Sequence, residues 1–132
     1  MTKIVFVQVQ DTATKLLRIH EIALNHFQRQ DPLWILVQDM AALEFLDTLL
    51  WRYPEESFVP HSTSGQDIIT ISTTSGPVPT LFNLCQTPVS AQDTTKVVYE
   101  LEDTTSAQKK QASELRYQAY RQAGYEISYK TF

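Results

Sequence analysis

The segment Lys3-Ile-Val-Phe-Val-Gln-Val9 decides the fold of this chain. Most of its side chains are apolar and several are β-branched, so both faces of the strand that it forms are expected to be buried. Burial on both faces is typical of a parallel sheet that helices cover on each side. The segment therefore predicts a buried strand of a parallel sheet.

The residues that follow alternate between helix and strand patterns. Residues 12–30 predict an amphipathic helix, which Asp11 or Thr12 caps and Asp31-Pro32 ends. Residues 33–37 form a second apolar strand, and Asp39 caps a second helix whose inner side carries Leu43, Leu46, Leu49 and Leu50. The order β-α-β-α favours an α/β layer fold with a mostly parallel sheet and right-handed crossovers.

The second half of the chain predicts five more strands or helices after a long loop at residues 52–66. Gly124 suits the position that follows the C-terminus of a helix. The length of 132 residues predicts a single domain over residues 1–132. The expected elements are strands at 67–72, 80–85 and 96–101, a helix at 105–123, and a last strand at 125–129.

Charge and cysteine content restrict the classes of protein. Residues 31–103 carry eleven acidic and two basic side chains, whereas residues 104–132 carry five basic and two acidic ones. A net charge of −4 disfavours strong binding to nucleic acid phosphates. Cys85 is the only cysteine, so we expect a reducing, cytoplasmic compartment and a buried, unreactive thiol. No stretch is typical of a signal peptide or of a membrane span.

Catalytic and cofactor motifs are missing from the sequence. The turn after the first strand has no glycine, and neither dinucleotide nor P-loop fingerprints occur. His20 and His26 lie six residues apart and should point to different sides of a helix, so we expect no metal and no cofactor. Two other arrangements are also weak indications of catalysis. They are His61 beside serines and the adjacent pair Glu55-Glu56. We therefore expect a protein that is not an enzyme.

The stretch Trp51-Arg-Tyr-Pro-Glu-Glu-Ser-Phe-Val-Pro-His61 is the most informative feature for function. Its aromatic residues either plug the edge of the core or form an exposed patch for a partner. The sequence leaves these two interpretations equally open. Prolines at positions 54 and 60 would stiffen the loop and lower its ordering cost on binding.

The last predicted helix carries a second set of candidate residues. Arg116, Tyr117, Tyr120 and Arg121 are close in sequence, and Tyr117 is a helical neighbour of both Tyr120 and Arg121. A solvated helix with half-buried tyrosines is favoured over a basic groove for an acidic peptide.

Two motifs resemble one known family. Leu50-Trp-Arg-Tyr-Pro-Glu-Glu-Ser-Phe-Val-Pro-His61 is similar to the W-x-x-P-x-x-S-F-V-P-H segment of the chi subunit of bacterial DNA polymerase III. Arg116-Tyr-Gln-Ala-Tyr-Arg-Gln-Ala-Gly124 resembles the R-Y-x-A-Y-R-x-A-G end of the last helix in that family. The resemblance implies a three-layer α/β/α sandwich and a non-catalytic accessory subunit of the clamp-loader assembly.

The resemblance also implies two partners. Trp51, Pro54 and Phe58 fall on the positions that bind a clamp-loader subunit called psi. Lys110, Arg116, Tyr117 and Arg121 are the candidates for binding the acidic, phenylalanine-ended tail of single-stranded-DNA-binding protein. The other two basic positions of the family are Glu114 and Gln118 here, which implies a weak or altered tail site.

Two functions follow from the resemblance. The first is a replication accessory subunit that links the clamp loader, through psi, to single-stranded-DNA-binding protein, with no direct contact to nucleic acid or membrane. The alternative is a chi-fold binding module that serves another complex and has lost the tail site. An α/β hydrolase or transferase is a third class, which would need a polar pocket at the strand ends.

Overall fold

The computed structural model describes residues 2–52, 59–65, 67–92 and 94–131. Its helices and strands agree with the predicted ones to within a few residues at each end. In chain order they are β1 (Lys3–Val9), α1 (Thr12–Gln28), β2 (Leu33–Leu36), α2 (Met40–Arg52), β3 (Ile69–Ser72), β4 (Thr80–Asn83), β5 (Val97–Asp103), α3 (Ala107–Gln122) and β6 (Glu126–Lys130).

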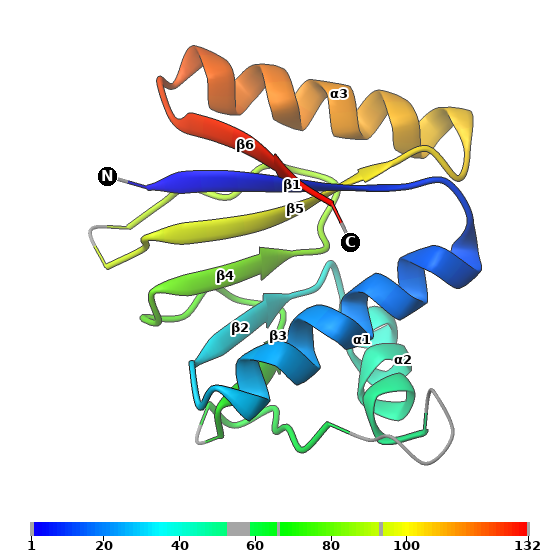
Figure 1. Ribbon diagram of the computed structural model, residues 1–132, viewed down its shortest axis with the longest axis vertical. Coiled ribbons are helices and arrows are strands. Elements are labelled where there is room, and N and C mark those ends of the chain that lie inside the picture. The colour runs from blue at the N-terminus through cyan, green and yellow to red at the C-terminus, as the bar shows by residue number, and fades with distance from the viewer. Residues whose placement is uncertain (1, 53–58, 66, 93, 132) are drawn as a thin grey trace.

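The strands form one sheet in the order β3-β2-β4-β5-β1-β6. Every pairing between these strands is parallel, so the sheet is more uniform than the mostly parallel one that was predicted. Helix α3 covers one face, and α1 and α2 cover the other (Figure 1). This arrangement confirms the three-layer α/β/α sandwich.

Strand β1 contributes side chains to both faces, as its apolar sequence predicted. Val7 and Val9 pack into the core under α1 and α2, and Ile4 and Phe6 pack into the core under α3. In the first core they join apolar residues of both helices and of the loop after α2, among them Ile19, Ile22, Leu46, Leu50 and Val59.

Side-chain caps fix where the first two helices begin. Asp11 accepts a hydrogen bond from the backbone N–H of Thr14 at 2.7 Å, and Asp39 accepts one from Ala42 at 2.9 Å. Helix α1 ends at Gln28, two residues earlier than predicted, because Gln30 adopts a left-handed φ of 55°. The predicted caps are therefore confirmed, and the predicted end of α1 was slightly too late.

The face covered by α3 holds the second core. Gly124 has a φ of 85°, a conformation that glycine adopts without strain, and it turns the chain from α3 into β6.

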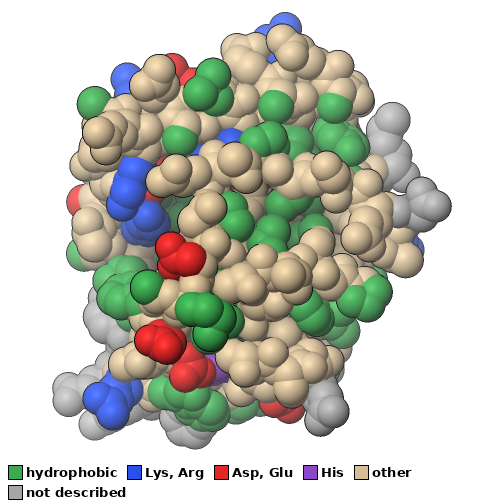
Figure 2. Space-filling view, turned by 180° about the vertical axis from the view of Figure 1, so that it is seen from behind, with side chains coloured by type: hydrophobic (Ala, Val, Ile, Leu, Met, Phe, Trp, Pro, Cys, Tyr) green, Lys and Arg blue, Asp and Glu red, His purple; other side chains and the backbone are tan. Residues whose placement is uncertain are grey.

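In the view of Figure 2, hydrophobic side chains lie in a hollow of the surface below α3, and Lys or Arg side chains gather to one side of it. Among the described residues, no helix is both long and apolar enough to cross a membrane.

Candidate partner-binding surfaces

Trp51 lies in the last turn of α2, and 45% of its surface is exposed. Its ring centroid is 4.6 Å from that of His61, at an interplanar angle of 38°. The other two residues predicted for this surface, Pro54 and Phe58, lie outside the described residues. The structure thus places one large aromatic side chain at the molecular surface, where a partner can reach it.

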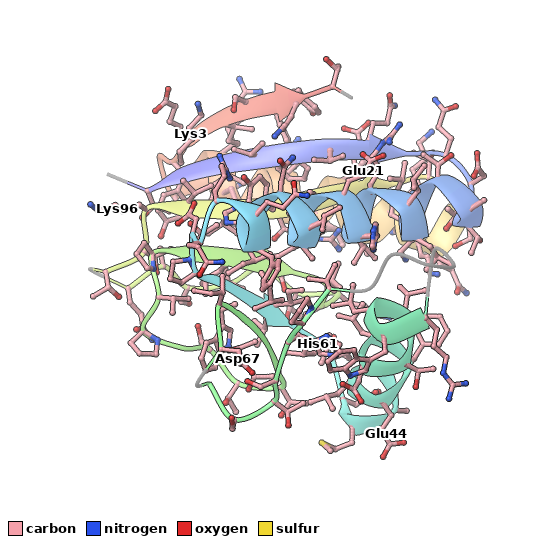
Figure 3. The ribbon with its side chains drawn as sticks, turned by 60° about the horizontal axis from the view of Figure 1, so that its bottom comes forward. Lys3, Glu21, Glu44, His61, Asp67 and Lys96 are labelled. Carbon is pink, nitrogen blue, oxygen red and sulfur yellow. The ribbon has the colours of Figure 1, made fainter. Side chains whose placement is uncertain are left out.

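His61 supports Trp51 from the loop that follows α2. Its Nε2 atom is 2.7 Å from Oδ1 of Asp47, and its Nδ1 atom is 2.6 Å from the carbonyl oxygen of Val59. Val59 is buried, and its N–H donates to the carbonyl of Leu50 at 2.9 Å. Figure 3 shows His61 in the loop segment that lies beside α2. Val59 and His61 are therefore structural parts of this loop.

One side of α2 continues this exposed surface toward the start of the helix. Met40, Glu44, Asp47 and Trp51 follow each other at spacings of four, three and four residues, which places them on the same side of a helix. Met40 is 59% exposed, although apolar residues of that size are usually buried. Met40 was not predicted from the sequence, although its spacing of eleven residues from Trp51 places both on one side of α2.

The outer flank of α3 carries most of the residues predicted to bind an acidic tail. Lys110 and Arg121 are exposed, and Tyr117 is partly buried. The ring of Tyr117 lies 5.7 Å from that of Phe6 in β1, which fixes the tyrosine against the sheet. Glu114 is exposed on the same flank, so a carboxylate stands between the two cations.

Arg116 is placed differently from the other predicted tail-binding residues. Only 6% of it is exposed, and its Nε donates to Oε1 of Glu100 at 2.9 Å. Its two terminal nitrogens donate to the backbone carbonyls of Gln86 and Leu101 at 3.2 and 3.0 Å. The guanidinium is therefore engaged inside the protein and does not lie on the outer flank of α3.

Glu100 is the centre of a buried polar network under α3. The Tyr120 hydroxyl donates to its carboxylate, and Nδ2 of Asn83 donates to it at 2.7 Å. Burial raises the pKa of Glu100, and the nearby Arg116 guanidinium opposes that rise. Because Tyr120 also accepts from the backbone N–H of Val89, the network ties α3 and the β4–β5 connection to the sheet.

A cavity of about 700 Å³ opens at the carboxyl ends of the strands. This edge is where parallel α/β sheets most often bind ligands. Lys15 and Asp103 form an ion pair of 2.7 Å at its rim. Most of its lining is apolar and comes from α1, α2 and the ends of β2, β4 and β5, namely Leu16, Ile19, Val37, Ala42, Phe45, Leu46, Leu49, Leu84 and Leu101.

Cys85 is the candidate nucleophile in the lining of this cavity. Cys85 lines it and is half-buried, and burial raises the pKa of its thiol, which disfavours the reactive thiolate. In the part of the chain that the structure describes, no histidine lines the cavity to act as a base. A pocket exists at the strand ends, but the described residues around it do not form a nucleophile and base pair.

Comparison with known families agrees with the two motifs. Residues 1–128 match the model of the family described as DNA polymerase III chi subunit, HolC. The match spans both the Trp51–His61 segment and the Arg116–Gly124 segment. No match to a curated protein was found.

Proposed function

Because this chain belongs to the DNA polymerase III chi subunit family, we propose that it links a psi-type clamp-loader subunit to single-stranded-DNA-binding protein. The family supports an accessory role in DNA replication, as a subunit without catalytic activity. The two partners and the residues that bind them are the specific content of this proposal.

The exposed Trp51 is the observation that best supports binding of a psi-type partner. Tryptophan is enriched among the residues that dominate binding energy, especially where its ring is held in place before binding. The contact with His61 holds the ring in this way, since His61 is itself fixed by Asp47 and Val59. We propose Trp51, Pro54 and Phe58 as the centre of this interface.

Tail binding is the second part of the proposed function. The family resemblance directs the tail to Lys110 and Tyr117 on the outer flank of α3, and the exposed Arg121 would supply a second cation there. Arg116 would act there as a positioning residue, because its contact with Glu100 fixes the helix on the sheet.

An alternative function is a chi-fold binding module that serves another complex and no longer binds the tail. The exposed Glu114 favours this alternative, because its carboxylate would repel an acidic peptide on the outer flank of α3. Gln118 is also exposed and offers no charge to offset that repulsion.

Affinity purification of the full chain from its own cells, followed by mass spectrometry, distinguishes the two functions. The proposed function predicts recovery of clamp-loader subunits and of single-stranded-DNA-binding protein. Recovery of an unrelated complex, reproduced with purified components, would instead establish the alternative. The Trp51→Ala variant serves as the matched control for binding through the proposed surface.

A further inference from the structure

We propose that His61 is held as a cation, protonated on both ring nitrogens, and that Asp47 is thereby a positioning residue for the exposed Trp51. The inference adds a fixed positive charge against the aromatic residue at the centre of the proposed partner-binding surface. Its consequence for affinity rests on the proposed function, whereas the charge of His61 can be measured without a partner.

Both ring nitrogens of His61 face oxygen atoms that accept hydrogen bonds. Nδ1 lies 2.6 Å from the carbonyl oxygen of Val59, and Nε2 lies 2.7 Å from Oδ1 of Asp47. A neutral imidazole carries a single N–H, so it can donate to only one of these oxygens. Its other nitrogen would then turn a lone pair toward an oxygen at hydrogen-bonding distance, which is repulsive. The doubly protonated ring donates to both oxygens.

The two oxygens act as acceptors and not as donors. The carbonyl of Val59 has no proton to give, and its position is fixed because the N–H of Val59 donates to the carbonyl of Leu50 at 2.9 Å. The side chain of Asp47 is 44% exposed, so water solvates its charge. An ionised carboxylate only accepts hydrogen bonds, so both protons must come from His61.

Burial opposes a positive charge on His61, because a buried charge is costly unless it is paired and hydrogen-bonded. None of its side-chain surface is exposed. However, the ring has the carboxylate of Asp47 as a counter-ion and an acceptor at each nitrogen. The indole of Trp51 lies at a centroid distance of 4.6 Å, within the range of a cation–π contact. These contacts together offset the cost of burial.

The surroundings of the ring make Asp47 the residue that balances its charge. Among the described residues, Asp47 of α2 forms the ion pair with His61. On its other side the loop is joined to β3, since the N–H of Ser62 donates to the carbonyl of Ile69 at 3.0 Å. Strand β3 carries no charged side chain. Replacement of Asp47 by a neutral residue therefore removes the counter-ion of His61.

Nitrogen NMR of the isotope-labelled full chain measures the charge of His61 directly. A doubly protonated ring gives two nitrogens of protonated type, whereas a neutral ring gives one unprotonated nitrogen at a clearly different chemical shift. The double variant His20→Gln, His26→Gln leaves His61 as the remaining histidine and so assigns its signals. We expect two protonated nitrogens at neutral pH. An unprotonated nitrogen in folded protein would overturn the inference.

Asp47→Asn tests the carboxylate while it keeps the shape of the side chain. The new amide can donate to Nε2, so His61 should become neutral, with its proton on the nitrogen that faces Val59. Glu44→Gln is the matched control, because it removes the same charge from the same side of α2 and should leave both nitrogens protonated. The same protonation state in both variants would overturn the role of Asp47. If Asp47→Asn does not fold, Asp47→Ser replaces it with a smaller neutral side chain.

Tryptophan fluorescence gives a second reading that needs no partner. A protonated imidazole quenches an adjacent indole more strongly than a neutral one does, so Asp47→Asn should brighten the emission. In a Trp51→Phe background, where Trp34 is the remaining tryptophan, Asp47→Asn should have no effect. An equal change in that background would show that the cation does not act on Trp51, and would overturn the positioning role.

Calorimetry with a purified psi-type partner measures the consequence for binding. We expect Asp47→Asn to weaken binding by about fivefold and Glu44→Gln by less than about twofold, because only Asp47 holds the ring that supports Trp51. Equal weakening by the two variants would overturn the positioning role, since affinity would then follow the charge of α2 alone. A native protein that does not bind the partner would remove the proposed function, while NMR and fluorescence would still decide the inference.

Discussion

The guanidinium of Arg116 lies 2.9 Å from the carboxylate of Glu100, and both side chains are buried between α3 and the sheet. The carboxylate also accepts hydrogen bonds from Asn83 and Tyr120, so its oxygens are satisfied inside the protein. Two residues of the R-Y-x-A-Y-R motif, Arg116 and Tyr120, therefore act in the architecture of α3. The motif fixes the helix that carries the candidate tail-binding residues.

Removal of Arg116 should destabilise the protein strongly. Arg116→Ala leaves Glu100 buried without its cation, which costs about 3 to 5 kcal/mol in comparable buried pairs. Urea unfolding measures the free energy of unfolding of this variant. The control is Arg121→Ala, which removes an exposed arginine five residues later and should change stability by less than about 0.5 kcal/mol. Similar stabilities of the two variants would show that the pair with Glu100 is unimportant for folding.

The sequence predicted this helix well but not the roles of its two arginines. Periodicity placed Arg116, Tyr117 and Arg121 on one helix, and the structure agrees. Periodicity could not show that Arg116 faces the sheet. Burial of this arginine is favourable because it pairs with Glu100, which lies in β5. Glu100 itself lies in an apolar strand pattern, where a charged residue gives no indication of its partner.

The strand and helix order was predictable because each element carries its own pattern. The buried strand at Lys3–Val9 and the caps at Asp11 and Asp39 are local signals, and all were confirmed. The cavity at the strand ends was not predictable, since its walls come from side chains of three helices, of β4 and β5, and of the residues that follow β2. Nor could the sequence show that Lys109 lines this cavity whereas the neighbouring Lys110 does not.

Acidification should destabilise the protein through its buried histidines. Burial lowers the pKa of His20 and His26 below the ordinary value of 6.5, so near that pH the unfolded chain binds more protons than the folded one. Stability therefore falls as the pH drops below about 6.5. Urea midpoints measured between about pH 7.5 and 5.5 should decrease, and the double variant His20→Gln, His26→Gln should show a smaller decrease. A pH dependence that the double variant leaves unchanged would contradict this assignment.

Trp51→Ala should weaken binding of the psi-type partner by about 2 kcal/mol or more, because a large aromatic side chain at the centre of an interface commonly contributes that much. Calorimetry with the purified partner measures the change. Phe45→Ala is the matched control, since it removes a comparably exposed aromatic residue from the other side of α2 and should leave this affinity unchanged. Unchanged affinity in a folded Trp51→Ala protein would exclude Trp51 from the interface.

Met40 tests whether the same interface extends along α2. Met40→Ala removes an exposed side chain three helical turns before Trp51, on the same side of the helix. An extended interface predicts a loss of about 1 kcal/mol in affinity for the psi-type partner, with no loss of stability. An affinity equal to that of the native protein would limit the interface to Trp51 and the loop that follows it.

The contact between His61 and Trp51 predicts that the two residues act together in partner binding. His61→Ala removes the ring against which Trp51 rests, so the indole becomes less ordered before binding and the affinity falls. If His61 acts through Trp51, the combined variant should bind hardly less well than Trp51→Ala alone. A double-mutant cycle measured by calorimetry should then give an interaction energy of about 1 kcal/mol.

Phe45→Ala combined with His61→Ala provides the additive reference. Additive losses for His61→Ala and Trp51→Ala would mean that His61 does not position Trp51 and affects the partner separately.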